Sequence, residues 1–444
     1  MKYSCCLVLA FVLFAQSVDA DELTVIHAGW LLAVPGEPPA PRQSIVIRNG
    51  RIAGVSSGYL RLSDLGETET TGSSARIVDL SQAFVLPGLI DSHVHLSSAP
   101  GHGEVGRAVL QTEAELALVA SKHAEMTLQA GFTTVVDFGS VGTPGNENAI
   151  FAVRDAVRDG RLAGPRVLAA GTPIAATGLE RSSPYRDEVI ASIDNRSVCD
   201  SPYDCRRAVR HQVKRGSDII VFFNTGSLLA ENPVAQTMTE EEMRAIVQTA
   251  HSLGRKVIAD GHHAAGIAAA DSAGADIVDS LHLYDDTTFG SLRNDIFVQS
   301  HIYGIVQAVG DTPESLHTGL WGWLPEPILL RFQAIRLRPF AVMQAYREGI
   351  RNIAYASDAG VYAWGENAGD FVEFVKRGMS STDALKSATV NAARMLGLDN
   401  ELGSIAAGMK ADIIAVQSSP LDDISELGRI LFVMRDGIIY RQPL

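Results

Sequence analysis

The stretch FVLPGLIDSHVHL, residues 84–96, decides the fold. It is apolar up to Ile90, and a Pro87-Gly88 turn precedes the short run of a strand that is buried on both faces. His93 and His95 follow two residues apart, so on a strand both imidazoles point to one side. A strand offers a divalent metal two nitrogen ligands in this way, but only further ligands elsewhere separate a metal site from two hydrogen-bonded histidines.

The composition is that of a large globular protein. A chain of 444 residues with 46% hydrophobic content can bury a sizeable core, which favours one large domain with a smaller companion. The formal net charge of −14 and the lack of any basic run argue against nucleic acid or anionic lipid as a partner. The expected partner is a small molecule, and the sequence leaves open whether the chain forms a homo-oligomer.

The first 20 residues have the layout of a secretory signal peptide. Lys2 precedes an apolar segment, Leu7–Phe14, and small residues follow up to Ala20. The apolar segment is too short to cross roughly 30 Å of hydrocarbon, which argues against a membrane anchor. We expect cleavage after Ala20, a mature chain from about Asp21 without a membrane span, and export to the periplasm or secretion.

Two cysteines remain in the expected mature chain, in the segment SVCDSPYDCRR. An exported compartment permits Cys199 and Cys205 to pair, so we expect a small disulfide loop. Two independent thiols are the alternative, because the sequence does not give the distance between them.

The patterns along the chain predict two kinds of structure. Near the amino terminus, ELTVIHAGWLLA and SIVIRNGRIAGV alternate apolar and polar residues, and Asn49-Gly50 forms a hairpin turn in the second segment. Eight short apolar runs then alternate with helical patterns over residues 87–398, which predicts an α/β fold of the (β/α)₈ TIM-barrel type. The tail returns to short strands, so residues 21–86 and 399–444 are predicted to form one small β-sandwich domain.

Six motifs in this order resemble the amidohydrolase superfamily of metal-dependent hydrolases: LPGLIDSHVHL, AGFTTVVDFG, AHSLGRKV, IAYASDAGV, SATVNAARMLGL and GSIAAGMKADIIAV. The resemblance is to its imidazolonepropionase-like branch, which includes exported Xaa-Pro dipeptidase-like and ochratoxinase-like enzymes. It spans nearly the whole expected mature chain. It implies a barrel flanked by a β-sandwich and hydrolysis of an amide bond in a dipeptide or an N-acyl amino acid.

The resemblance is incomplete at the metal ligands. Such enzymes hold two metals with His-x-His on strand one, a carboxylated Lys on strand four, a His on each of strands five and six, and an Asp on strand eight. The ends of that set are present here, as His93, His95 and Asp358. The matching positions on strands four, five and six are occupied by Val221, Asp260 and Ser280. Without the bridging Lys, two metals are not expected.

Strand alternation softens two of these changes, because Asp260 shares a face with His262, and Ser280 shares one with His282. A single zinc is therefore expected, with another divalent metal as the alternative, held by His93, His95 and Asp358 with a further contact from His262, His282 or Asp260. The zinc would polarise the substrate carbonyl and activate a water, and Asp358 would pass the proton to the leaving nitrogen. Asp358 and His262 are the candidate catalytic residues.

The candidate substrate-binding residues lie near the expected barrel mouth. They are His301, late in the seventh apolar run, and Trp321, Trp323 and Trp364, each of which has packing against its own barrel as the alternative role. The competing hypothesis for the whole chain is a barrel that has lost metal-dependent hydrolysis and serves as a binding protein or a metal-free lyase or isomerase.

Overall fold

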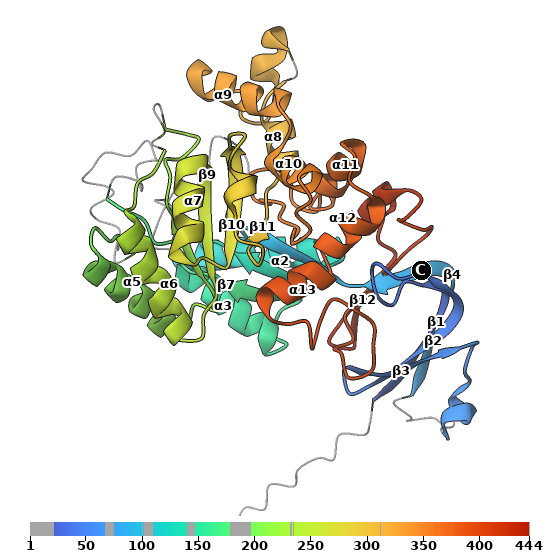
Figure 1. Cartoon of the computed structure of the whole chain (residues 1–444). Coiled ribbons are helices and arrows are strands. Elements are labelled where there is room, and N and C mark those ends of the chain that lie inside the picture. Colours follow the sequence, from blue (N-terminus) through green and yellow to red (C-terminus); the bar gives the residue numbers. More distant parts are fainter. Residues whose placement is uncertain are drawn as a thin grey trace, which may run out of the picture.

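The computed structural model describes residues 22–66, 75–99, 101, 110–139, 147–177, 197–230, 233, 235–310 and 312–443. The expected signal peptide, residues 1–20, lies outside the described residues. Within them the chain has an α/β fold, in which parallel strands carry helices along one side and a separate, mostly antiparallel sheet lies at one end (Figure 1). No helix of the described residues is both long and apolar enough to cross a membrane.

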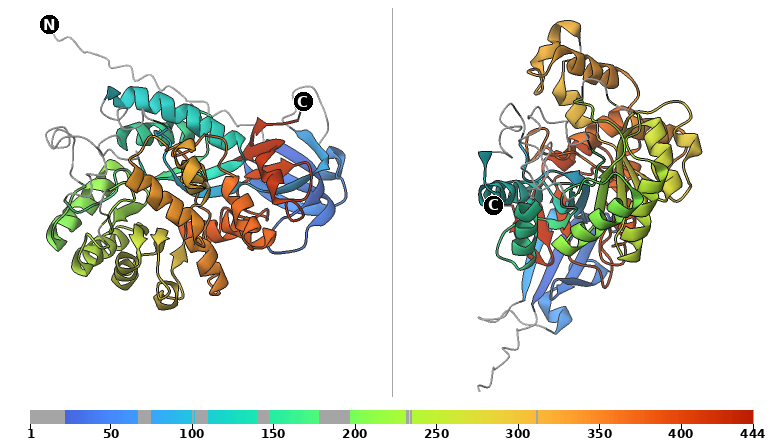
Figure 2. Two further views of the ribbon diagram at one scale, coloured as in Figure 1. Left: turned by 90° about the horizontal axis from the view of Figure 1, so that it is seen from above. Right: turned by 90° about the vertical axis from the view of Figure 1, so that its left-hand side faces the viewer.

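The sheet at one end combines strands from both ends of the chain. Its order is β14-β13-β12-β4-β1-β2-β3. These strands are β1 (Leu23–Leu31), β2 (Ala40–Arg48), β3 (Arg51–Ser57), β4 (Arg76–Pro87), β12 (Ile413–Val416), β13 (Phe432–Arg435) and β14 (Ile438–Arg441). The red and blue strands lie side by side in both further views (Figure 2). The carboxyl-terminal strands thus join the sheet directly through β4.

The hairpin predicted at Asn49-Gly50 is confirmed. Arg48 pairs with Arg51 across a two-residue turn, and φ is +49° at Asn49 and +75° at Gly50. Two positive φ angles give the turn the twist of its flanking strands, and asparagine followed by glycine tolerates them best.

All pairings among the remaining named strands are parallel. One sheet has the order β5-β6-β7 and the other has the order β11-β10-β9-β8. Their strands are β5 (Leu89–Val94), β6 (Phe132–Asp137), β7 (Arg166–Ala169), β8 (Ile220–Phe223), β9 (Val257–His263), β10 (Ile277–Leu283) and β11 (Phe297–Val298). Isolated parallel bridges join Ile174 to Phe222, Val298 to Ile353, and Ala359 to Val94.

The helices follow these strands in sequence, and most of them lie along the strands, whereas α9 projects away from them (Figures 1 and 2). They are α2 (Glu113–Gln129), α3 (Glu147–Arg158), α5 (Pro202–Arg215), α6 (Glu240–Ser252), α7 (Ala264–Ala273), α8 (Tyr303–Ala308), α9 (Glu326–Leu337), α10 (Ala341–Arg347), α11 (Gly369–Lys376), α12 (Ser381–Ser387) and α13 (Val390–Leu396). Short 3₁₀ turns are η1 (Leu62–Leu65), η3 (Phe289–Ser291), η4 (Pro313–Thr318) and η5 (Ile424–Gly428).

Strand β8 shows how alternation separates two layers of core. Ile220 and Phe222 pack with Val209 of α5 and Met243 of α6 in one apolar cluster. Val221 packs on the other side of the strand, in a different apolar cluster. Because successive side chains point to opposite faces, one strand serves both the helix layer and the inner layer.

The sulfur atoms of Cys199 and Cys205 are 2.12 Å apart, and the two Cα atoms are 4.9 Å apart, so the structure joins the predicted pair. Cys205 lies in α5, and both residues are fully buried in the cluster between α5 and α6.

Replacing both cysteines with serine is expected to lower the free energy of unfolding by about 2 kcal/mol, the chain-entropy value for so short a loop. Urea denaturation of the parent and the double variant measures this difference. Intact mass after alkylation, with and without reductant, checks the bond itself. Two freely alkylated thiols in the untreated protein would contradict the pairing.

Candidate metal centre

Backbone pairing brings the ends of the first and last parallel segments together. The Asp358 N–H donates to the His93 carbonyl at 2.9 Å, and the His95 N–H donates to the Ala359 carbonyl at 2.8 Å. Asp358 has a φ of +58°, a strained conformation for a residue other than glycine. Its side chain is thereby turned toward the two imidazoles.

Three donor atoms form a triangle at this point. His93 Nε2 lies 3.1 Å from His95 Nε2, and Asp358 Oδ1 lies 3.2 Å from His95 Nε2 and 3.6 Å from His93 Nε2. Tetrahedral coordination at 2.0–2.1 Å places neighbouring ligand atoms about 3.3 Å apart, so the three separations match the edges of such a site. The donor set fits one divalent cation.

The far nitrogens of both imidazoles are already bonded. His93 Nδ1 lies 2.6 Å from Asp279 Oδ2, and His95 Nδ1 lies 2.6 Å from the carbonyl oxygen of Gly139. An acceptor at Nδ1 fixes the proton there and leaves Nε2 as a lone-pair donor, which is the usual arrangement of metal-binding histidines.

The carboxylates around the triangle favour a positive charge at this point. Burial would lower the pKa of His93, but Asp279, Asp358 and Asp260 raise it to about 10. Burial would raise the pKa of Asp358, but His301, His95 and His93 hold it well below its usual range. The neighbouring imidazoles therefore keep Asp358 ionised.

More titratable side chains surround the triangle. His301 Nε2 lies 3.2 Å from Asp358 Oδ2, and His301, His93 and Asp279 form a second group with ligand atoms in reach of one another. His262 Nδ1 lies 3.2 Å from His282 Nδ1, and burial lowers the pKa of both imidazoles. Two neutral rings in such contact hold one proton between their Nδ1 atoms.

Asp260 and His282 belong to neither ligand group found among the described residues. Both are buried, and burial, with the neighbouring Asp279, raises the pKa of Asp260 to about 7. Asp260 Oδ1, His282 Nε2 and His301 Nδ1 have no hydrogen-bond partner among the described atoms. These buried polar atoms mark where a ligand would make polar contacts.

The position of the family's bridging Lys is apolar in the structure as well as in the sequence. Val221 belongs to the same apolar cluster as Phe138, and the ring of Phe138 stacks on His93 with centroids 3.7 Å apart. One face of His93 is therefore covered by carbon, and no anionic side chain is available at Val221 to hold two like-charged ions together.

Asp279 was missed as a site residue because regular alternation places Ser280, not its neighbour, toward the inside. In the structure the pairing of β10 with β9 shifts after Ser280, and φ is +73° at Ser280 and +52° at Leu281. Asp279 lies opposite Asp260 ahead of that shift, so it shares the face of Asp260 and reaches His93 from there. The signal in the sequence was the buried acid within an apolar strand, which requires a partner.

The three tryptophans are positioned by packing and by hydrogen bonds to backbone carbonyls. Trp321 is buried in the main apolar cluster, and its indole N–H donates to the Val361 carbonyl at 3.1 Å. Trp323 stacks on Trp321 at 5.9 Å. Trp364 donates to the Ser98 carbonyl at 2.9 Å, and Ser98 lies just beyond His95. Of the three, Trp364 is anchored to the turn that follows His95.

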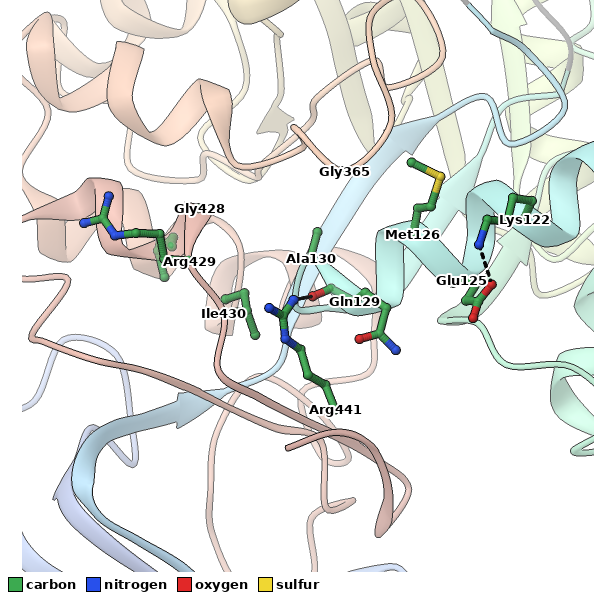
Figure 3. Close-up of a pocket in the computed structure, with 11 residues that line it drawn as sticks. Lys122, Glu125, Met126, Gln129, Ala130, Gly365, Gly428, Arg429, Ile430 and Arg441 are labelled. Atoms are coloured by element: carbon green, nitrogen blue, oxygen red, sulfur yellow. Dashed lines mark hydrogen bonds and ion pairs between the residues drawn. The ribbon is translucent and has the colours of Figure 1, made fainter. Parts of the chain in front are cut away.

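A separate pocket of about 300 Å³ lies between α2, η5 and the end of β14 (Figure 3). Lys122, Gln129, Arg429 and Arg441 are among its lining residues, and Arg441 donates to the Gln129 carbonyl at 3.2 Å. None of the lining residues belongs to the histidine and aspartate cluster, so this pocket is not the candidate metal centre.

Asp279→Asn is expected to weaken zinc binding 10- to 100-fold, because the carboxylate that orients His93 is lost while the shape is kept. Competition with a chromophoric chelator measures the affinity. Asp276→Asn is the matched control, since Asp276 bonds His251 at 2.8 Å on the surface at the start of the same strand. Equal affinities of the parent and Asp279→Asn would exclude the orienting role.

The fold and the site define a class of protein. The model of the amidohydrolase family matches residues 84–321 and 323–439, so the chain belongs to the amidohydrolase family, whose hydrolases act on carbon–nitrogen bonds. The resemblance stated from the motifs is confirmed.

Two named relatives are similar over nearly the whole chain. Ochratoxinase of Aspergillus niger is 26% identical over 461 residues, which cover 97% of this chain and 89% of ochratoxinase. A solved structure of a Xaa-Pro dipeptidase with bound methionine in its active site is 30% identical, with a TM-score of 0.81 over 94% of this chain and 100% of that one. The crystal structure of A. niger ochratoxinase has a TM-score of 0.76 at 23% identity, which shows the fold.

Proposed function

We propose that the protein hydrolyses an amide bond in a small substrate with the help of one zinc ion. The observation that carries this proposal is the triangle of His93, His95 and Asp358, whose separations suit tetrahedral coordination. Family membership supports hydrolysis at a carbon–nitrogen bond. The apolar surroundings of Val221 support one ion instead of two.

The proposed scaffold is a (β/α)₈ barrel over residues 87–398, with a β-sandwich domain from residues 21–86 and 399–444. The series of parallel pairings from β5 to β11, together with the bridges at Ile174, Ile353 and Ala359, supports closure of the barrel. Residues 1–20 are proposed as a signal peptide for export to the periplasm or secretion.

His93, His95 and Asp358 would hold the metal, with Asp260 and His282 as further proposed contacts. When bound, a zinc ion polarises an amide carbonyl and lowers the pKa of water. Asp358 is ionised and presents Oδ2 to His301 at 3.2 Å, so it can accept a proton from the attacking water and deliver it to the leaving nitrogen. His262 is the second proposed catalytic residue. Its Nδ1 lies 3.2 Å from His282 Nδ1, so it is placed to take part in proton transfer.

The proposed substrate class is a dipeptide or an N-acyl amino acid. The names of the relatives, a Xaa-Pro dipeptidase and ochratoxinase, support this choice. His301 has one buried nitrogen without a partner in the described structure and is proposed to contact the substrate. Trp364, beside the turn after His95, and Trp321 and Trp323 are proposed to shape the apolar side of the pocket.

The experiment is metal analysis of the purified protein combined with hydrolysis of Xaa-Pro dipeptides and N-acyl amino acids. We expect one zinc per chain, loss of hydrolysis after treatment with dipicolinic acid, and recovery after one equivalent of zinc is added. Two metals per chain would refute the single-ion site. Hydrolysis unchanged by metal removal would favour metal-free chemistry.

A further inference from the structure

Helix α9 carries apolar residues on two opposite faces. Ile328, Leu329, Phe332 and Ile335 are buried in the main apolar cluster and fix the helix to the molecule. On the other side, the exposed positions after the first residue are all apolar: Pro327, Leu330, Ala334 and Leu337. Leu330 is 47% exposed and Leu337 is 71% exposed. A helix that only covered its own core would present polar residues at these positions.

The outward residues have the spacing of a coiled-coil seam. Positions 327, 330, 334 and 337 are separated by three, four and three residues, which is the a and d pattern of a heptad. This pattern places the four side chains in one narrow row along the helix. Such a row is complementary to a second helix. Because its side chains are apolar, covering them with that helix is more favourable than exposing them to water.

The position of α9 in the molecule allows a second helix to approach. Figures 1 and 2 show α9 at the end of a projection that stands out from the parallel strands and their covering helices. Leu320, in the turns just before α9, is also exposed at 43%. The row is thus presented at an outer extremity of the chain.

We propose that α9 is a homodimer contact, in which two copies of the chain pair antiparallel about a two-fold axis at the level of Phe332. In that register position 330 faces 334 of the other copy, and position 327 faces 337. A large Leu330 meets a small Ala334, and Pro327 meets Leu337. The same patch occupies both sides of the contact, as an isologous interface requires.

The charges at the two ends of α9 agree with this register. Glu326 precedes the row and Arg338 follows it, at equal distances from position 332, so each lies opposite the other across the axis. Neither has an ion-pair partner among the described residues, and Arg338 is positioned by Tyr284, over whose ring it lies at 4.0 Å. A parallel pairing would instead set like charges against each other, which is unfavourable.

The size of the contact sets its strength. A helix of 12 residues is about 18 Å long, so one helix pair buries less than the roughly 800 Å² per partner of a standard interface. The dimer should therefore be reversible, with a dissociation constant on the order of micromolar.

Sedimentation velocity of the full chain over about 1–100 µM tests the contact, since that range brackets a micromolar constant. The parent is expected to shift from monomer to dimer. The double variant Leu330→Glu/Leu337→Glu should stay monomeric, with a dissociation constant at least tenfold higher than that of the parent and unchanged hydrolytic activity. Leu118→Glu on α2 is the matched control, because Leu118 is 72% exposed and lies outside α9.

Cysteine cross-linking tests the register in a chain that carries Cys5→Ser and Cys6→Ser. A mixture of Leu330→Cys chains and Ala334→Cys chains should form disulfide-linked pairs, whereas either variant alone should cross-link much more slowly. Cross-linking of each variant with itself would overturn the antiparallel register. A parent that remains monomeric at the highest concentration, or a dimer that persists in Leu330→Glu/Leu337→Glu, would overturn the proposed contact.

Discussion

His93→Ala is expected to remove the metal and to lower kcat/KM for an amide substrate on the order of 10³-fold. His93 supplies one corner of the donor triangle, and its other nitrogen bonds Asp279 at 2.6 Å. The substitution removes a ligand and leaves the Asp279 carboxylate buried without its imidazole. Metal content by mass spectrometry and steady-state hydrolysis measure the two losses.

The matched control for this variant is His251→Ala. His251 also bonds an aspartate, Asp276, at 2.8 Å, but its side chain is 43% exposed at the end of α6. It should retain its zinc and its activity, because solvent replaces the lost contact. If His93→Ala keeps both zinc and activity while remaining folded, the triangle is not the metal centre.

Asp91→Ala is expected to lower the free energy of unfolding by about 3–5 kcal/mol, which is a large fraction of the stability of a typical domain. Asp91 is fully buried on β5, two residues before His93. Its oxygens accept hydrogen bonds from the Ser357 N–H and hydroxyl, from Asn367 Nδ2 at 3.0 Å, and from the His93 N–H at 3.3 Å. Removing the carboxylate leaves these donors buried without an acceptor.

Urea denaturation monitored by tryptophan fluorescence gives this difference. Asp79→Ala is the control, since Asp79 also accepts a backbone N–H, from Ser81 at 2.9 Å, but near the surface of β4. It should cost less than about 1 kcal/mol. A loss at Asp91 no greater than the loss at Asp79 would mean that solvent reaches the Asp91 partners.

The parts of the site that follow regular strand geometry could be predicted from the sequence. His93 and His95 are two residues apart on β5, so alternation alone puts both imidazoles on one side. The motif around Asp358 predicted that it lies beside the two histidines. In the structure, backbone pairing between Asp358 and His93 accounts for their proximity. The Asn49-Gly50 hairpin was predictable for a similar reason, because the turn residues prescribe the backbone.

The parts that depend on irregular backbone could not be predicted in the same way. Asp279 shares the face of Asp260, and the pairing of β10 shifts only after Ser280, where φ is positive at two residues, so the inward alternation assigned to Ser280 and His282 does not hold along the whole strand. His301 follows β11, a strand of only two residues, so no alternation pattern indicated its approach to Asp358. Both contacts join segments far apart in the sequence, and local propensity carries no information about them.

The pairing of β12 with β4 has a consequence for how the chain matures. Ile413 lies opposite Pro87 in this pairing, roughly 300 residues away along the chain, and contacts of such long range form late because the intervening loop must first close. A ribosome delivers β1 to β4 long before β12, so during synthesis β4 has an open edge with unpaired N–H and carbonyl groups. Until β12 is synthesised and pairs with β4, the incomplete amino-terminal sheet is therefore a suitable site for chaperone binding.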